Sequence, residues 1–233
     1  MHFAHHLPAC VLRATMAALG LLALSCAIAQ PIASGCGELA NGYGPYDYRT
    51  DRDKLPIVEN HHFTPPVEAL IRGISGTVGG ELDYVLRAFP NHHRALVAMT
   101  RLSERSQWQR PSGAQWDIDC YFDRALRFRP ADVISRLLYA DYLAKRSRRD
   151  EAQAQLARST GEAGDNGFTH YNIGLQYLGL KQFDKAVEQA HRALELGFTR
   201  PELANQLRAA GRWKEPAVPP KVDAPAVPAS AAH

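Results

Sequence analysis

The sequence lacks a strong net charge of either sign. Its 27 Lys and Arg residues nearly balance its 24 Asp and Glu residues, which leaves a formal net charge of +3 over 233 residues. A nucleic-acid-binding surface needs an excess of basic residues that neutralise phosphates. The one basic run, at 145–149, falls in an expected turn between helices, where charged residues are usually solvated. We therefore predict no nucleic-acid partner.

The signatures of common enzyme classes are also missing. The chain has no Gly-x-Ser-x-Gly sequence, which would mark the nucleophile of a hydrolase. Its glycine cluster at 73–80 is not followed by the Gly-Lys-Ser/Thr sequence of a phosphate-binding loop, so we interpret it as an ordinary connection. We predict a protein that is not an enzyme and that needs no cofactor.

Two adjacent histidine pairs, His61/His62 and His92/His93, leave one alternative open. Neighbouring histidines on a helix point in different directions, so each pair supplies at most one ligand. A metal or acid–base site built from His62 and His93 with nearby carboxylates is the alternative hypothesis. The simpler interpretation is that these histidines cap helices and form hydrogen bonds in turns.

The first 29 residues have the pattern of a secretory signal peptide. Arg13 precedes an apolar run at 14–27, and small residues stand at Ala27 and Ala29, as cleavage after Ala29 requires. The run is shorter than the roughly 20 apolar residues that span a bilayer. We predict a periplasmic or secreted protein with no further membrane span. An uncleaved anchor and lipidation of Cys26 remain alternatives.

Cleavage after Ala29 would remove Cys10 and Cys26 and leave Cys36 and Cys120. An even pair of cysteines in an exported protein favours a disulfide. The predicted Cys36–Cys120 bond would tie the N-terminal segment to the helical region. The alternative is a pair of unrelated thiols.

A repeat of 34 residues runs through the second half of the chain. The matching positions are Ala140 and Gly174, Leu143 and Tyr177, Asp150 and Asp184, and Ala152 and Ala186. A period of this length is typical of stacked helical repeats. Further upstream, the stretch 82–90 resembles 122–130 at an offset of 40, and we assign the six additional residues to an enlarged turn within 106–115.

The stretch 166–196 resembles a tetratricopeptide repeat. The resemblance rests on Tyr-Asn-Ile-Gly-Leu-Gln-Tyr-Leu at 171–178, Phe-Asp-Lys-Ala at 183–186 and Ala-Leu-Glu-Leu at 193–196. This family has small residues at the positions of Gly174, Ala186 and Ala193, where two antiparallel helices approach closely. The preceding unit is a weaker match because Ser159 stands where Ala193 does. Such helix pairs bury their faces only by stacking on neighbours.

We therefore predict an all-α fold, a helix-turn-helix repeat solenoid with a loop-rich N-terminal segment. The expected parts are a signal peptide at 1–29, a loop-rich segment at 30–64, a degenerate helix pair at 65–90, three repeats at 91–200, a capping helix at 201–213 and a disordered Pro/Ala-rich tail at 214–233. A glycine-rich link at 161–167 is expected to be flexible.

The resemblance also implies a concave face, lined by the first helix of each unit, that binds a protein or peptide. When the three units are aligned with the positions of the family's repeat, this face comprises Arg94, Arg101, Arg105, Ile134, Leu137, Asp141, Phe168, Tyr171, Leu175 and Leu178. The mainly apolar residues of the later units favour an amphipathic or extended apolar peptide, with arginines pairing an acidic flank. Alternatively, the capping helix or the N-terminal segment covers some of these side chains.

The resulting functional hypothesis is an exported bacterial adaptor that acts in envelope assembly or maintenance. A purely structural envelope component is a further alternative, beside the metal site already described.

Overall fold

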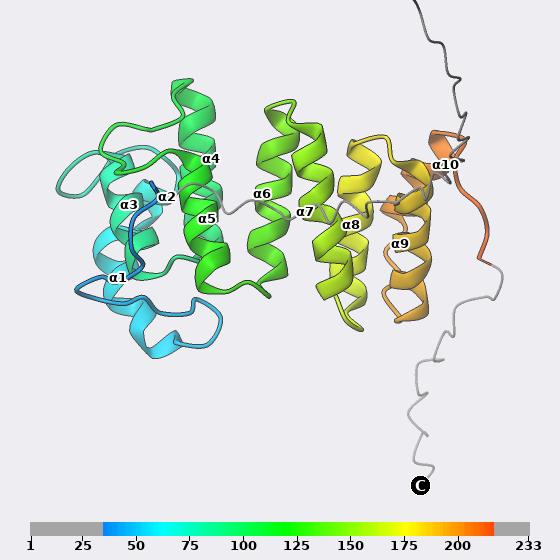
Figure 1. The fold of residues 1–233 in the computed structure, drawn as a ribbon, viewed down its shortest axis with the longest axis horizontal. Coiled ribbons are helices and arrows are strands. Elements are labelled where there is room, and N and C mark those ends of the chain that lie inside the picture. Colours follow the sequence, from blue (N-terminus) through cyan, green and yellow to red (C-terminus); the bar gives the residue numbers. More distant parts are fainter. Residues whose placement is uncertain (1–34, 217–233) are drawn as a thin grey trace, which may run out of the picture. The chain divides into compact units, whose positions relative to one another are not determined.

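The computed structural model describes residues 35–216, and all the regular secondary structure in this range is helical (Figure 1). This confirms the all-α prediction. The elements are η1 (Arg52–Lys54), α1 (Leu55–His62), α2 (Pro65–Glu68), α3 (Val78–Ala88), α4 (His93–Ser106), α5 (Ile118–Phe128), α6 (Val133–Lys145), α7 (Arg149–Glu162), α8 (Gly167–Gly179), α9 (Phe183–Glu195) and α10 (Glu202–Ala209). No helix in this range is long and apolar enough to cross a membrane. The predicted signal peptide and residues 217–233 of the tail lie outside the described residues.

Helices α4 to α9 fall where the three repeats were expected. Within the second and third units, α6 packs against α7 and α8 packs against α9. Helix α6 also contacts α4 and α8, so the first helices of the three expected repeats are neighbours (Figure 1). The connection between α4 and α5 runs from 107 to 117, which agrees with the enlarged turn inferred from the offset of 40. Helix α10 packs on both α8 and α9, at the position expected for the capping helix.

Small residues stand where helices approach most closely. Ala140, Ala152, Ala186 and Ala193 are all buried. A Cβ atom on Gly174 would lie 2.5 Å from Cδ2 of Leu203 and 3.3 Å from Cβ of Gln189. A side chain at 174 would therefore displace Leu203 of α10 and press on α9, so the absence of a side chain lets α9 and α10 pack closely on α8.

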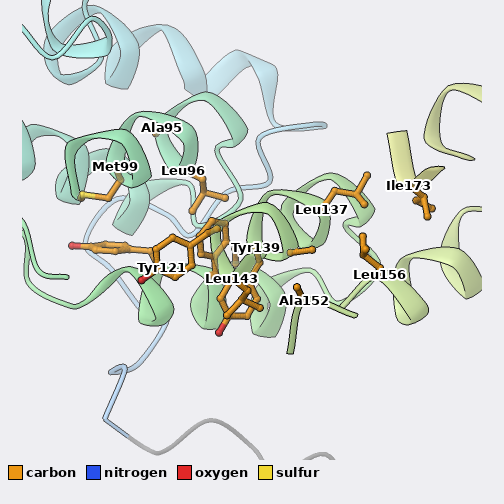
Figure 2. Packing of buried hydrophobic residues seen from close by; sticks show 14 of the residues in the cluster. Ala95, Leu96, Met99, Tyr121, Leu137, Tyr139, Leu143, Ala152, Leu156 and Ile173 are labelled. Carbon is orange, nitrogen blue, oxygen red and sulfur yellow. The ribbon is translucent and has the colours of Figure 1, made fainter. Parts of the chain in front are cut away.

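Larger residues form one continuous core between these contacts. Figure 2 shows Leu96 of α4, Tyr139 of α6, Leu156 of α7 and Ile173 of α8 along this core. The ring of Tyr139 stacks on Phe122 with 4.8 Å between centroids. Each helix therefore buries its apolar side chains against the elements before and after it.

The N-terminal part differs from the expectation in two respects. The segment 30–64 was expected to be loop-rich, but it contains α1, which packs on α3 and buries Leu55 and Val58. The degenerate helix pair expected at 65–90 begins with α2, which has only four residues and ends at Glu68. Leu70 has a φ of 57°, a left-handed conformation that a helix cannot continue through.

The glycine-rich link at 161–167 is also shorter than expected. Helix α7 continues to Glu162 and α8 begins at Gly167, which leaves only residues 163–166 between them. Asn166 caps α8 because its side-chain oxygen accepts the Thr169 amide at 3.0 Å.

The predicted disulfide is confirmed: Cys36 is bonded to Cys120 of α5. One turn further along α5, the buried Arg124 reaches the same N-terminal segment. Its Nη1 donates to the carbonyl oxygens of Cys36 at 3.1 Å and Glu38 at 2.6 Å. Its guanidinium also lies 4.1 Å from the centre of the Trp116 ring. Arg127, on the same helix, donates from Nη2 to the carbonyl of Gly37 at 3.0 Å. Helix α5 therefore holds residues 36–38 through the disulfide and three hydrogen bonds.

Replacing both cysteines by serine (Cys36→Ser with Cys120→Ser) should lower the free energy of unfolding by about 4–5 kcal/mol, because the bond closes a long loop. Urea unfolding measures this difference. Alkylation of the wild-type protein under denaturing, non-reducing conditions should leave Cys36 and Cys120 unlabelled. Labelling of both cysteines would contradict the bond.

Replacing Gly174 by valine should destabilise the fold by about 1–3 kcal/mol, because the new side chain collides with α9 and α10. Gly179→Ala is a matched control on the same helix, since a Cβ there has no atom within 4 Å. Thermal melting should show a lower midpoint for the first variant and no loss for the second. Equal midpoints would show that α8 does not need a small residue at 174.

Candidate functional site

Two pockets open along helices α4, α6 and α8. The pocket between α4 and α6 has a volume of about 190 Å³ and an apolar floor of Val97, Ala98, Ile134 and Leu138. The pocket between α6 and α8 has a volume of about 440 Å³, and its apolar lining is Ala140, Ala144, Leu175 and Leu180.

A third pocket connects these two. It shares Arg101 and Leu138 with the α4–α6 pocket, and Asp141 and Lys145 with the α6–α8 pocket. The three pockets therefore form one surface, which we call the α4–α6–α8 groove. Its floor is apolar and its charged side chains stand along the rim.

The groove contains some of the residues that the sequence assigned to the concave face. Arg94, Arg101, Asp141 and Leu175 line it, as does Ile134. Their contribution to partner binding stays a prediction.

Five other assigned residues do not line the groove. Leu137 is only 4% exposed and belongs to the core. Tyr171 is buried: its ring packs on Phe198 and its hydroxyl donates to Glu202 of α10 at 3.3 Å, so the C-terminal region covers it, as one alternative anticipated. Leu178 packs against the core.

Phe168 is exposed, but it packs edge-on against Phe198 rather than in a groove pocket. Arg105 faces a separate pocket between loops, where its Nη1 donates to the Leu70 carbonyl at 3.0 Å. The buried Leu137 and Tyr171 are corrections to the expected face. Phe168 and Arg105 are exposed outside the groove, and their contribution to partner binding stays a prediction.

The sequence interpretation missed Val97, Leu138 and Lys145. On α6 the groove residues Ile134, Leu138, Asp141 and Lys145 follow a spacing of four, three and four residues, which marks one face of a helix. This periodicity was available in the sequence. Choosing Leu137 in place of Leu138 shifted the expected face by about 100°, the rotation of one helical residue.

The cations along the groove differ in how far they are already paired. Arg94 is bound by Glu68, with Nε to Oε1 at 2.9 Å, and a second carboxylate, Glu59, lies 3.4 Å from its Nη1. The hydrogen bond that Arg94 donates to Glu68 raises the pKa of Arg94. Lys145 pairs with Asp141 at 2.9 Å. Arg101 is exposed and forms no ion pair with any residue in the described part of the chain.

Each histidine named as a possible ligand already has a carboxylate partner. Nδ1 of His62 lies 2.7 Å from Oε2 of Glu81, and the ring stacks on Tyr84. Nε2 of His93 lies 2.9 Å from Oδ2 of Asp132. Between residues 35 and 216 no three side chains of His, Cys, Asp or Glu come together as a metal site would require.

His92 caps a helix, as the simpler interpretation proposed. Its Nδ1 accepts the Ala95 amide at 3.1 Å at the start of α4. Because Nδ1 is an acceptor, the proton of the neutral ring lies on Nε2, which donates to Glu59 at 3.1 Å. Burial lowers the pKa of His92 and outweighs the opposing effect of Glu59.

A buried polar cluster lies at the start of α4 and α6. Nδ2 of the fully buried Asn91 donates to Asp47 at 2.8 Å and to Asp132 at 2.9 Å, while its oxygen accepts the Tyr48 amide. Arg129 donates to Asp47 at 2.7 Å. Every polar atom of the Asn91 side chain thus has a protein partner.

Both carboxylates of this cluster are held in their charged form. Burial alone would raise the pKa of Asp47, but hydrogen bonds from Arg49, Asn91 and Arg129 bring it well below its usual range. The pKa of Asp132 is also lowered, because hydrogen bonds from His93 and Asn91 outweigh its burial. The cluster is fully paired, so we assign it to structure rather than to chemistry.

Comparison with known proteins identified no relative of this chain. No family model matches the chain, and no curated protein or solved structure matches it either.

Asp47→Asn should lower the free energy of unfolding at pH 7 by about 1–3 kcal/mol, since it removes the charge that two arginines face. A carboxylate with a depressed pKa stabilises the fold above its unfolded value of about 3.9, and this stability is lost as pH falls through the folded value. The variant should therefore lose less stability than the wild type between pH 5 and 2.

Thermal unfolding across this pH range measures both effects. Asp184→Asn is a matched control because Asp184 is 95% exposed, and it should behave as the wild type. If Asp47→Asn and the wild type lose stability in parallel on acidification, the proposed charge state of Asp47 is wrong.

Proposed function

We propose that this chain is a tetratricopeptide-like repeat protein that binds another protein or peptide along the α4–α6–α8 groove. The observation that carries the proposal is the continuity of three pockets over the first helices of successive units. An apolar floor bordered by charges is how a helical groove receives the apolar side chains of a bound segment. The sequential contacts of α4, α6 and α8 support the repeat interpretation.

The groove favours a partner segment with bulky apolar side chains and a nearby carboxylate. Val97, Ile134 and Leu138 offer an apolar floor for one side chain. Leu175 and Ala144 offer another between α6 and α8. Arg101 stands between these positions without an internal partner, so it is available to a carboxylate of the ligand at little cost in broken contacts.

We further propose that the protein acts outside the cytoplasm, in envelope assembly or maintenance. The Cys36–Cys120 bond supports this location because disulfides persist mainly in oxidising compartments. The signal-peptide pattern that ends at Ala29 supports it independently.

The test begins with a displayed peptide library selected against the wild-type protein, followed by titration of the selected peptides. Leu138→Asp should weaken binding about tenfold or more, because it places a charge on the apolar floor. Arg101→Glu should lower the affinity for peptides that carry a carboxylate by a similar factor. High salt should reduce the difference in affinity between this variant and the wild type.

Phe168→Ser provides the control, since it removes an exposed apolar side chain outside the groove. Its affinity should equal that of the wild type, and thermal melting should show that all three variants are folded. Selected peptides whose affinity is unaffected by both groove variants would show that the binding face lies elsewhere.

A further inference from the structure

Exposed apolar side chains gather at a second place, away from the groove. The large hydrophobic residues that are exposed in the described range are Ile57, Ile71, Ile74, Trp108 and Phe168. Three of them lie in two loops, 69–77 and 107–117, with exposed fractions of 72% for Ile71, 53% for Ile74 and 62% for Trp108. Figure 1 shows both loops near the C-terminal end of α4.

The two loops are joined to each other and to α4. The Thr77 hydroxyl donates to the Ser112 carbonyl at 2.9 Å. Arg105, on the last turn of α4, donates to the carbonyl of Leu70. At Gly113, where φ is 83°, a Cβ atom would lie 2.0 Å from Oγ1 of Thr77, so the loops approach this closely only with glycine there. We call this surface, residues 69–77 and 107–113, the loop edge.

A buried carboxylate fixes the first of these loops. Glu81 of α3 is buried, and its Oε1 accepts the backbone amides of Ile74 at 3.0 Å and Ser75 at 2.8 Å. Its other oxygen is paired with His62. Because Glu81 holds the backbone in this conformation, the exposure of Ile71 and Ile74 belongs to an ordered loop.

The loop edge combines apolar projections with unpaired positive charge. Between the loops lies a pocket of about 430 Å³ whose apolar lining includes Leu70, Leu102, Trp108 and Pro111. Arg72 follows Ile71 directly and, like Arg105, forms no ion pair within residues 35–216. Arg110 lies 3.8 Å from Asp117, and both side chains are exposed.

We propose that the loop edge docks on the surface of an anionic lipid bilayer. Trp108, Ile71 and Ile74 enter the region of the headgroups and upper acyl chains, where tryptophan is favoured because its ring is apolar and its N–H is polar. Arg72 and Arg105 face the lipid phosphates, which are attracted to basic residues near the membrane surface.

Two observations favour a lipid surface over a protein partner. The apolar side chains project from loops on either side of a pocket, so a fluid surface accommodates them without a matching shape. Arg72 and Arg105 form no ion pair within residues 35–216, and a bilayer with anionic headgroups presents many equivalent anionic partners. This surface differs from the α4–α6–α8 groove in both its residues and its ligand.

Quenching of tryptophan fluorescence by lipids with brominated acyl chains tests the proposal in the full chain. Vesicles of brominated phosphatidylglycerol and phosphatidylcholine should quench a component of the emission that Trp108→Phe lacks. Since this readout reports the position of residue 108 itself, membrane contact by any other part of the chain does not imitate it. Vesicles of phosphatidylcholine alone should quench this component much less.

The double variants Ile71→Ser/Ile74→Ser and Arg72→Gln/Arg105→Gln should each reduce the Trp108-dependent quenching several-fold. The matched control is Ile57→Ser/Phe168→Ser, which removes two apolar residues elsewhere that are 57% and 52% exposed and should leave the quenching unchanged. Equal melting temperatures would show that the variants are folded. Absence of Trp108-dependent quenching, or equal loss in the control, overturns the proposal, as would a protein that binds the loop edge while lipid does not.

Discussion

The fold depends on one buried amide. Asn91 stands just before α4 and bridges Asp47 of the N-terminal segment to Asp132, the residue that caps α6. Two buried carboxylates facing the same small space repel each other unless donors stand between and around them. The amide supplies two of these donors, and Arg129 and His93 supply others. The positions of α4 and α6, and therefore of the pocket between them, follow from this bridge.

A second set of contacts attaches the same N-terminal segment to α5. The Cys36–Cys120 bond and the hydrogen bonds of Arg124 hold residues 36–38 on that helix, and the amide of Tyr46 donates to the carbonyl of Ala88 at the end of α3 at 2.9 Å. The buried guanidinium is stabilised by carbonyl groups and the Trp116 ring rather than by a carboxylate, and burial lowers its pKa. The segment is therefore an integral layer of the fold. It also reaches the border of the groove, because Tyr48 packs edge-on against His93, which lines the α4–α6 pocket.

The sequence was sufficient to predict features that depend on residues close together in the chain. It was not sufficient for features that depend on residues far apart in the chain. Helical periodicity and the 34-residue repeat predicted the helices after residue 91, and the need for small residues was visible at Gly174 and Ala186. Asn91 and Arg124 carried no signal, because the partners that make them important lie about 40 to 90 residues away in the chain. Their roles emerge only after the chain has folded. The groove falls between these cases, since its α6 residues share a helical period but the choice of Leu137 or Leu138 depends on how α6 is rotated against α4 and α8.

Helix α4 relates the two proposed surfaces to each other. Arg101 and Arg105 are one turn apart, yet the first lines the groove and the second is bound to the loop edge through the Leu70 carbonyl. Ser103, between them, is buried and donates to the Trp108 carbonyl at 2.6 Å, which fixes the second loop to the same helix. No hinge separates the surfaces, because both are attached to one continuous helix. If both proposals hold, a peptide in the groove is kept at a fixed distance and orientation from the lipid surface, which gives an envelope adaptor a defined geometry without a second domain.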